Sequence, residues 1–195
     1  MMRYRRYQGF NLGPIGFLII TNIILYIATS INPYLIELFG LQPAAFLREP
    51  WTIVTNLFIH APFPIIGHIL ANMLTLYFFG GYLIRLVGER NFFIVYFLGG
   101  IVGNIFYMLL GPPFSVAIGA SGAIFAVAGA LTVMRPKETV FIFPIPVPVP
   151  LWAAVIGGFL ILSFVPLVAW QAHLGGLVSG LVIGYFFRGR QRRFF

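Results

Sequence analysis

The sequence of 195 residues contains no cysteine and no aspartate, and only 8% of its residues are charged. Without cysteine the chain has neither a disulfide bond nor a thiolate nucleophile. Its acidic residues are four glutamates outside or at the ends of the long apolar runs: Glu37, Glu49, Glu89 and Glu138. A buried acid–base pair of carboxylates and a His-Glu-x-x-His zinc site are therefore excluded, and we expect no metal or other cofactor.

Apolar residues make up 60% of the chain, and the mean hydropathy is +0.98. A soluble fold of this length could not bury so much apolar surface. The apolar residues form six long runs, which we interpret as transmembrane helices: Pro14–Ser30, Ile69–Ile84, Phe92–Leu110, Ser121–Met134, Leu151–Val168 and Leu174–Phe187. The sequence thus predicts an all-α membrane protein with a single domain over residues 1–195, a core of about residues 14–188 and short basic tails.

Most basic residues stand at the ends of these runs and form no continuous stripe, which argues against nucleic-acid binding. They precede the first run, join the second to the third and the fourth to the fifth, and follow the sixth: Arg3, Arg5, Arg6, Arg85, Arg90, Arg135, Lys137, Arg188, Arg190, Arg192 and Arg193. Basic flanks favour the cytoplasmic side of a membrane. We therefore expect a multi-pass protein of the cell membrane with both termini in the cytoplasm, surrounded by the lipid bilayer.

Two connections between the runs have distinctive compositions. Residues 31–67 contain five prolines and Trp51, and this connection is long for a helix bundle. We expect it to fold into an outer element with Trp51 at the membrane interface. The segment Phe143–Pro150 alternates proline with apolar residues and is expected to be extended.

Three polar residues, Asn72, Ser121 and His173, share one predicted depth in the membrane. They lie 13, 14 and 15 residues before the arginine that ends their own segment, namely Arg85, Arg135 and Arg188. At ~1.5 Å per residue, parallel helices would place all three roughly 20 Å from the cytoplasmic face, inside a hydrocarbon layer about 30 Å thick. Polar residues at such a depth indicate a functional site.

Ser121 and His173 have the chemistry of a nucleophile and its base. Gly119-Ala120-Ser121-Gly122 matches the G-x-S-G pattern of many serine hydrolases, and Ser121 begins its predicted helix. Because no acidic residue is available to orient the histidine, the pair would be a Ser–His dyad. Each residue alone also fits a structural role, the serine in helix packing and the histidine as a hydrogen-bonded core residue.

His68 and Asn72 are four residues apart and share one helix face. They could hydrogen-bond to a neighbouring helix, a common use of both residue types in membrane bundles. Alternatively, they could donate to an oxyanion together with the backbone N–H of Ser121. The spacing leaves both interpretations open, and the shared depth favours the second.

A stripe of small residues predicts close packing of the sixth helix against the fourth. The sixth helix carries glycines at every fourth position, and the fourth offers a matching small face: Gly176, Gly180 and Gly184, and Gly122, Ala126 and Gly129. Such an approach would bring Ser121 within hydrogen-bond reach of His173.

Three segments in this order resemble the rhomboid family of intramembrane serine proteases over roughly residues 14 to 188: His68-x-x-x-Asn72, Gly119-Ala-Ser121-Gly122 and Ala172-His173-x-x-Gly176-x-x-x-Gly180. The resemblance implies a six-transmembrane-helix bundle with a long first outer loop. It also implies cleavage of transmembrane substrates near the outer membrane face, without a cofactor. Ser121 would then be the nucleophile, His173 the general base, and His68 and Asn72 the oxyanion stabilisers.

The resemblance extends to Phe125, which falls where the family often packs an aromatic ring on the catalytic histidine, and to His60, to which we assign a structural role. Two positions depart from the common pattern: Thr52 follows Trp51 where many relatives have arginine, and Arg85 stands where many have glutamate.

Our leading hypothesis is an intramembrane serine endopeptidase. The alternative is a non-proteolytic chaperone or quality-control factor that binds transmembrane helices in the same groove. A transporter ranks third, because the apolar runs contain no carboxylate and no evident inverted repeat.

Overall fold

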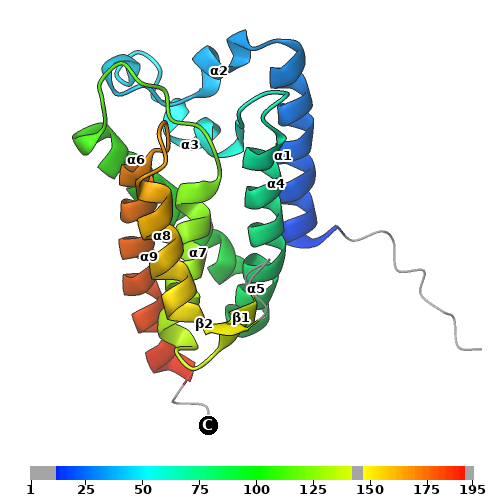
Figure 1. Ribbon diagram of the computed structural model, residues 1–195, viewed down its shortest axis with the longest axis vertical. Coiled ribbons are helices and arrows are strands. Elements are labelled where there is room, and N and C mark those ends of the chain that lie inside the picture. Colours follow the sequence, from blue (N-terminus) through cyan, green and yellow to red (C-terminus); the bar gives the residue numbers. More distant parts are fainter. Residues whose placement is uncertain (1–11, 142–146, 192–195) are drawn as a thin grey trace, which may run out of the picture.

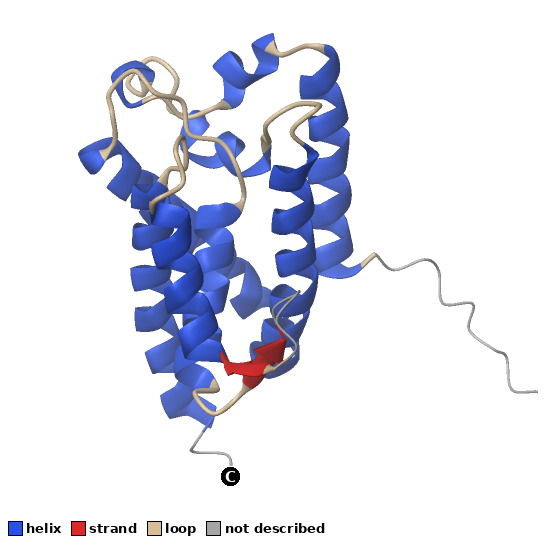
Figure 2. Ribbon diagram, in the orientation of Figure 1, coloured by secondary structure: helices blue, strands red, loops and turns tan. Residues whose placement is uncertain are grey.

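The computed structural model describes residues 12–141 and 147–191. The predicted basic tails with Arg3, Arg5, Arg6, Arg192 and Arg193 lie outside the described residues, as does the first part of the predicted extended segment, up to residue 146. The described chain is predominantly helical (Figure 2).

The longer helical elements are α1 (Gly13–Ile31), α4 (Ile66–Thr75), η3 (Leu76–Gly80), α5 (Gly81–Val87), α6 (Glu89–Leu110), α7 (Ser121–Met134), α8 (Leu151–Ser163) and α9 (Trp170–Gln191). The element η3 is a π-helical turn that joins α4 to α5. The three elements therefore form one continuous helical segment, Ile66–Val87. Four short helices separate α1 from α4: α2 (Tyr34–Phe39), η1 (Pro43–Ala45), α3 (Thr52–Thr55) and η2 (Asn56–Phe58). The strands β1 (Thr139–Phe141) and β2 (Pro148–Pro150) pair antiparallel.

Helix bounds agree closely with the apolar runs, except in the last two. The bounds of α7 are those predicted. Helix α8 ends at Ser163 instead of Val168, because Pro166 disfavours helix and Leu167 adopts a left-handed backbone with φ of 66°. Helix α9 has 22 residues where the apolar run had 14, so His173 lies inside its first turn. Polar residues had interrupted the apolar run without interrupting the helix.

Three described helical segments are long and apolar enough to cross a membrane: Gly13–Ile31, Ile66–Val87 and Glu89–Leu110. Helices α7 and α8 are apolar but shorter, with 14 and 13 residues. Large apolar side chains such as Phe17, Ile24 and Ile27 stand exposed on α1, as expected of a surface that faces lipid. The chain is therefore an integral membrane protein.

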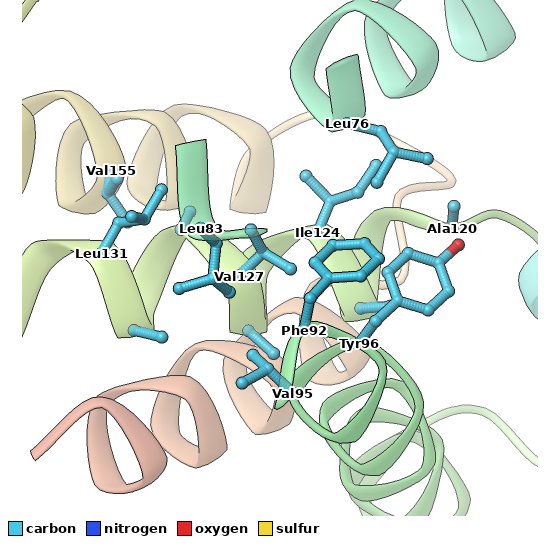
Figure 3. Packing of buried hydrophobic residues seen from close by; sticks show 14 of the residues in the cluster. Leu76, Leu83, Phe92, Val95, Tyr96, Ala120, Ile124, Val127, Leu131 and Val155 are labelled. Atoms are coloured by element: carbon cyan, nitrogen blue, oxygen red, sulfur yellow. The ribbon is translucent and has the colours of Figure 1, made fainter. Parts of the chain in front are cut away.

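Helix α7 lies at the centre of the bundle. Figure 1 shows α1 and α4 side by side at one side of α7, and α8 and α9 at the other. Ile124 and Val127 of α7 pack among Leu83 from α5 and Phe92 and Val95 from α6 (Figure 3). The start of α7 is therefore held from several sides by the surrounding helices.

Small residues let α9 approach the backbone of α7. A Cβ atom added to Gly176 would overlap the Gly122 carbonyl, and one added to Gly180 would overlap that of Ala126. This confirms the predicted close packing of the two helices. Gly129 belongs to the same small face, because a Cβ atom added there would lie 2.8 Å from the Leu177 carbonyl oxygen of α9, and Gly184 packs on Ala130.

The segment between α1 and α4 folds over the end of the bundle where α7 begins (Figure 1). The backbone of Leu41 pairs with Ala117 through hydrogen bonds of 2.9 and 2.8 Å. The Trp51 indole N–H donates to the Leu38 carbonyl at 2.9 Å. Thr52, one of the two departures from the family pattern, is buried and donates its hydroxyl to the Glu49 carbonyl at 2.6 Å. This segment is thus tied internally and to the residues that precede Ser121.

Candidate active site

Ser121 and His173 are in contact although 52 residues separate them in the sequence. Their Oγ and Nε2 atoms lie 2.7 Å apart. Ser121 is the first residue of α7 and is half-buried, while His173 is buried in the first turn of α9. The contact depends on the α7–α9 packing, because Gly122 and Gly176 follow these two residues in the same helices and meet backbone to backbone.

The His173 ring also packs against an aromatic side chain. The Phe125 ring lies 4.7 Å from the His173 ring, centroid to centroid, and is tilted by 32°. Nδ1 of His173 is buried and has no hydrogen-bond partner among the described residues. A neutral imidazole whose Nε2 accepts a proton from serine carries its own proton on Nδ1. Among the described residues, Phe125 and Ser121 therefore orient the ring, and no third residue hydrogen-bonds to its Nδ1.

Gly119 occupies a position that only glycine suits. Its φ of 121° lies in the left-handed region, where a side chain is strained. A Cβ atom added there would come within 2.8 Å of His68 Nε2 and 3.7 Å of Ser121 Oγ. Gly119 therefore lies between His68 and Ser121, and its missing side chain leaves their polar atoms facing one space.

His68 is oriented by a backbone donor. The N–H of Ala61 donates to His68 Nδ1 at 3.3 Å. Because Nδ1 accepts, the proton of the neutral ring is on Nε2, the atom that faces Gly119. His68 thus presents an N–H donor toward the start of α7.

Asn72 lies one turn further along α4 and is buried. Its Nδ2 donates to the His68 carbonyl at 2.8 Å, which leaves the second N–H of this amide available. Its Oδ1 has no hydrogen-bond partner among the described residues. The free N–H groups at the start of α7 and the dipole of that helix also favour negative charge beside Ser121.

The four predicted site residues thus come from three helices, α4, α7 and α9. The structure joins Ser121 to His173 by a hydrogen bond, and Gly119 connects this pair to His68. The described residues contain no group of three histidine or acidic side chains that could hold a metal ion.

His60 lies beside His68 and is fully buried. Its ring lies 5.0 Å from that of His68. Burial, and to a smaller extent the nearby His68, lower the pKa of His60 from 6.5 to about 3. The folded protein therefore keeps His60 neutral at pH values where the unfolded chain would bind a proton.

We expect the free energy of unfolding to decrease as the pH falls below 6.5 toward 3. Neutral His60 contributes its full share to the free energy of unfolding above pH 6.5, the pKa of histidine in the unfolded chain. At pH 5 about 2 kcal/mol of this contribution is lost. The measurement compares the melting temperature in detergent at pH 7 and pH 5 for the wild type and for His60→Gln. The variant is expected to have a lower melting temperature than the wild type at pH 7. Its melting temperature should, however, fall less between pH 7 and pH 5. An equal loss in both proteins would contradict this account.

The sequence interpretation missed a second polar cluster near the site. Asn56 and Asn104 form a buried pair of side-chain amides that hydrogen-bond to each other. The available signal was Asn104, an amide inside the third apolar run, which deserves the same scrutiny as Asn72.

Comparison with known proteins identifies the family of this sequence. The family model described as the Rhomboid domain matches residues 47–190. Rhomboid protein 1, mitochondrial, of Saccharomyces cerevisiae is 29% identical over 170 residues, which are 73% of this chain and 44% of the yeast protein.

Two further relatives show the same similarity. RHOMBOID-like protein 1 of Arabidopsis thaliana is 33% identical over 144 residues, 72% of this chain and 35% of the plant protein. Rhomboid-like protease 3 of Toxoplasma gondii is 30% identical over 177 residues, 84% of this chain and 65% of that protein. This chain thus spans less than half the length of the yeast and plant relatives. Because the family model covers well over half of the sequence, the chain belongs to the rhomboid family.

Proposed function

We propose that this protein is an intramembrane serine endopeptidase that cleaves transmembrane helices of other membrane proteins with a Ser121–His173 dyad. The 2.7 Å contact between Ser121 Oγ and His173 Nε2 is the observation that carries the proposal. Family membership supports it, since the Toxoplasma gondii relative is named a protease.

In the proposed mechanism His173 removes the proton from Ser121 Oγ as that oxygen attacks the scissile carbonyl carbon. His173 then donates this proton to the leaving amine, and the substrate stays bound to Ser121 as an ester. A water molecule, activated by His173 in the same way, attacks the ester and releases the new carboxyl group. No cofactor is required, because serine and histidine supply both the nucleophile and the proton transfers.

Three donors would stabilise the negative oxygen that forms during each attack. They are the backbone N–H of Ser121, the Nε2–H of His68 and the second N–H of Asn72. The tautomer of His68 supports this role, because the Ala61 N–H holds Nδ1 as the acceptor. Donors fixed in advance around a developing oxyanion are often the largest single contribution to such catalysis.

We also propose that the chain forms six transmembrane helices within one domain. It would lie in the cell membrane with both termini in the cytoplasm. Ser121 and Arg135 stand at opposite ends of α7, 14 residues apart. Arginine at the inner end would leave the dyad nearer the outer face, about 20 Å from the cytoplasmic side. Substrates would therefore be cut in the outer part of the bilayer.

A substrate helix must unwind before cleavage, because the carbonyls of an intact helix already accept hydrogen bonds along it. Each Gly or Pro near the outer end lowers substrate helix stability by about 1 to 3 kcal/mol relative to alanine. We therefore expect cleavage to slow when such residues of a cleaved substrate are replaced by leucine. The measurement is the initial cleavage rate in liposomes, with leucine replacements at the inner end of the same substrate as the control. Equal slowing by both sets would contradict local unwinding.

A serine-directed fluorophosphonate tests the proposed function. In detergent or liposomes the probe should attach to Ser121, as located by mass spectrometry, and should block cleavage of a transmembrane substrate. Ser179 provides an internal control, since its hydroxyl donates to the Gly176 carbonyl at 2.7 Å and has no hydrogen bond to a histidine in the described part of the chain. Binding of transmembrane helices without labelling or cleavage would favour the non-proteolytic chaperone instead.

Gly176→Val should reduce the cleavage rate by about a hundredfold or more while the protein still inserts into the membrane. The valine Cβ would overlap the Gly122 carbonyl and force α9 away from α7. A displacement of ~1 Å between reacting groups is enough for such a loss. Gly189→Val on the same helix is the control, because an added Cβ there meets nothing within 4 Å. Equal activity of the two variants would show that this approach of the helices is not required.

A further inference from the structure

We infer that Asn56 and Asn104 form a buried amide latch that positions Gly119, and through it Ser121 and the oxyanion donors. Both are thus positioning residues, which act through the backbone and do not touch the substrate. The inference rests on the proposed function for its effect on rate, and its structural part is testable separately.

The latch consists of two hydrogen bonds that run in opposite directions. Asn56 Nδ2 donates to Asn104 Oδ1 at 3.0 Å, and Asn104 Nδ2 donates to Asn56 Oδ1 at 2.7 Å. The second N–H of Asn104 donates to the Ile53 carbonyl at 2.7 Å. Each asparagine is only 2% exposed. Helix α6 thereby holds both α3, at Ile53, and the start of η2, at Asn56, which is 48 positions from Asn104 in the sequence.

The backbone of Asn56 carries this restraint to the active site. Its carbonyl accepts a hydrogen bond from the Gly119 N–H at 2.9 Å. Gly119 lies between His68 and Ser121 and has the left-handed φ of 121° described above. A shift of the Asn56 carbonyl would therefore move the N–H of Gly119, two residues before the nucleophile.

A paired amide resists such a shift more than apolar packing does. Leu57 also packs against α6, where a Cβ added to Gly100 would lie 2.8 Å from it, but an apolar contact fixes no direction. If one amide of a buried pair is removed, the other loses its hydrogen bonds without gaining water. The two residues are therefore expected to act as one unit, and removal of either releases the carbonyl that Gly119 uses.

The test uses Asn56→Ala, Asn104→Ala and the double variant in the full-length chain. Asn56→Ala keeps the backbone carbonyl and removes only its restraint. We expect kcat to fall ~10- to 100-fold with KM changed less than about twofold. The rate of fluorophosphonate labelling at Ser121 should fall in parallel. Because the two residues act together, their effects should not multiply. The kcat of the double variant should lie within about threefold of that of the slower single variant.

Asn91→Ala is the matched control on the same helix. Its Nδ2 donates to the Val87 carbonyl at 2.8 Å, at the opposite end of α6 from Asn104. Its kcat should match that of the wild type. Melting temperatures of all variants separate lost stability from lost positioning. The inference would be overturned if the latch variants had lower melting temperatures but an unchanged kcat. It would also be overturned if the losses of kcat in the two single variants multiplied in the double variant.

Hydrogen exchange at the Gly119 amide gives a readout that does not depend on activity. The amide should exchange at least about tenfold faster in either latch variant than in the wild type or Asn91→Ala, because its acceptor is no longer held. Unchanged exchange in both variants would overturn the latch. If the wild type itself neither cleaves substrates nor takes up the probe, the proposed function fails, and the exchange rates alone decide the inference.

Discussion

Ser121→Ala and His173→Ala should each abolish cleavage of a transmembrane substrate, with a loss on the order of 10⁴-fold or more. Removing the Ser121 hydroxyl leaves no nucleophile beside the base. Removing the His173 ring leaves the hydroxyl without a proton acceptor, because the contact of 2.7 Å with Nε2 is the side-chain hydrogen bond that the structure gives Ser121 Oγ. The measurement is the initial cleavage rate in liposomes, followed by gel electrophoresis of the products.

The double variant of Ser121 and His173 should be no slower than either single variant, since the two groups act as one unit. Thr132→Val is a suitable control, because it removes another buried hydroxyl from α7, one that donates to the Ala128 carbonyl at 2.9 Å. Its rate should remain near that of the wild type. Turnover well above background in Ser121→Ala would show that another residue is the nucleophile.

Asn72→Ala should reduce kcat by roughly 10²–10³ with little change in KM, as is typical when one oxyanion donor is lost. The reason is that this donor would act on charge that develops only in the transition state. His68→Ala should have an effect of the same kind and also weaken the binding of a phosphonate whose oxygen mimics the oxyanion. Steady-state kinetics in detergent measure both changes.

Asn22→Ala provides a closely matched control for Asn72→Ala. Both amides are buried, and both donate to the carbonyl four residues earlier at 2.8 Å, Asn22 to Leu18 and Asn72 to His68. Similar losses of stability are therefore expected, but only Asn72→Ala should slow turnover. Near wild-type kinetics for Asn72→Ala would mean that His68 and Asn72 serve helix packing alone.

Local composition was sufficient to predict most helices. The bounds of α7 agree with its apolar run, and α1 and α6 begin and end within three residues of the predicted positions. Hydropathy identifies such segments because backbone groups in lipid must be hydrogen-bonded within the segment itself. It failed at α9, where Gln171 and His173 are helical but polar, and at α8, where the backbone turns near Pro166.

Part of the candidate site could also be predicted from spacing. His68 and Asn72 share a helix face because they are four residues apart in a helix. The glycines at 176, 180 and 184 predict a close helix contact along α9. These are properties of a single helix. Which residue each glycine meets depends on how the two helices cross, so that Gly184 meets Ala130 and Gly129 meets Leu177.

The sequence by itself determined that this chain enters a membrane as helices, that it has no thiol nucleophile, no buried carboxylate pair and no His-Glu-x-x-His zinc site, and that it resembles the rhomboid family. Only the tertiary structure decided the 2.7 Å contact of Ser121 with His173 and the pairing of Asn56 with Asn104. The physical reason is one of range. Hydropathy and helix periodicity act over a few residues, whereas hydrogen bonds between residues about 50 positions apart depend on how whole helices pack, which no local pattern specifies.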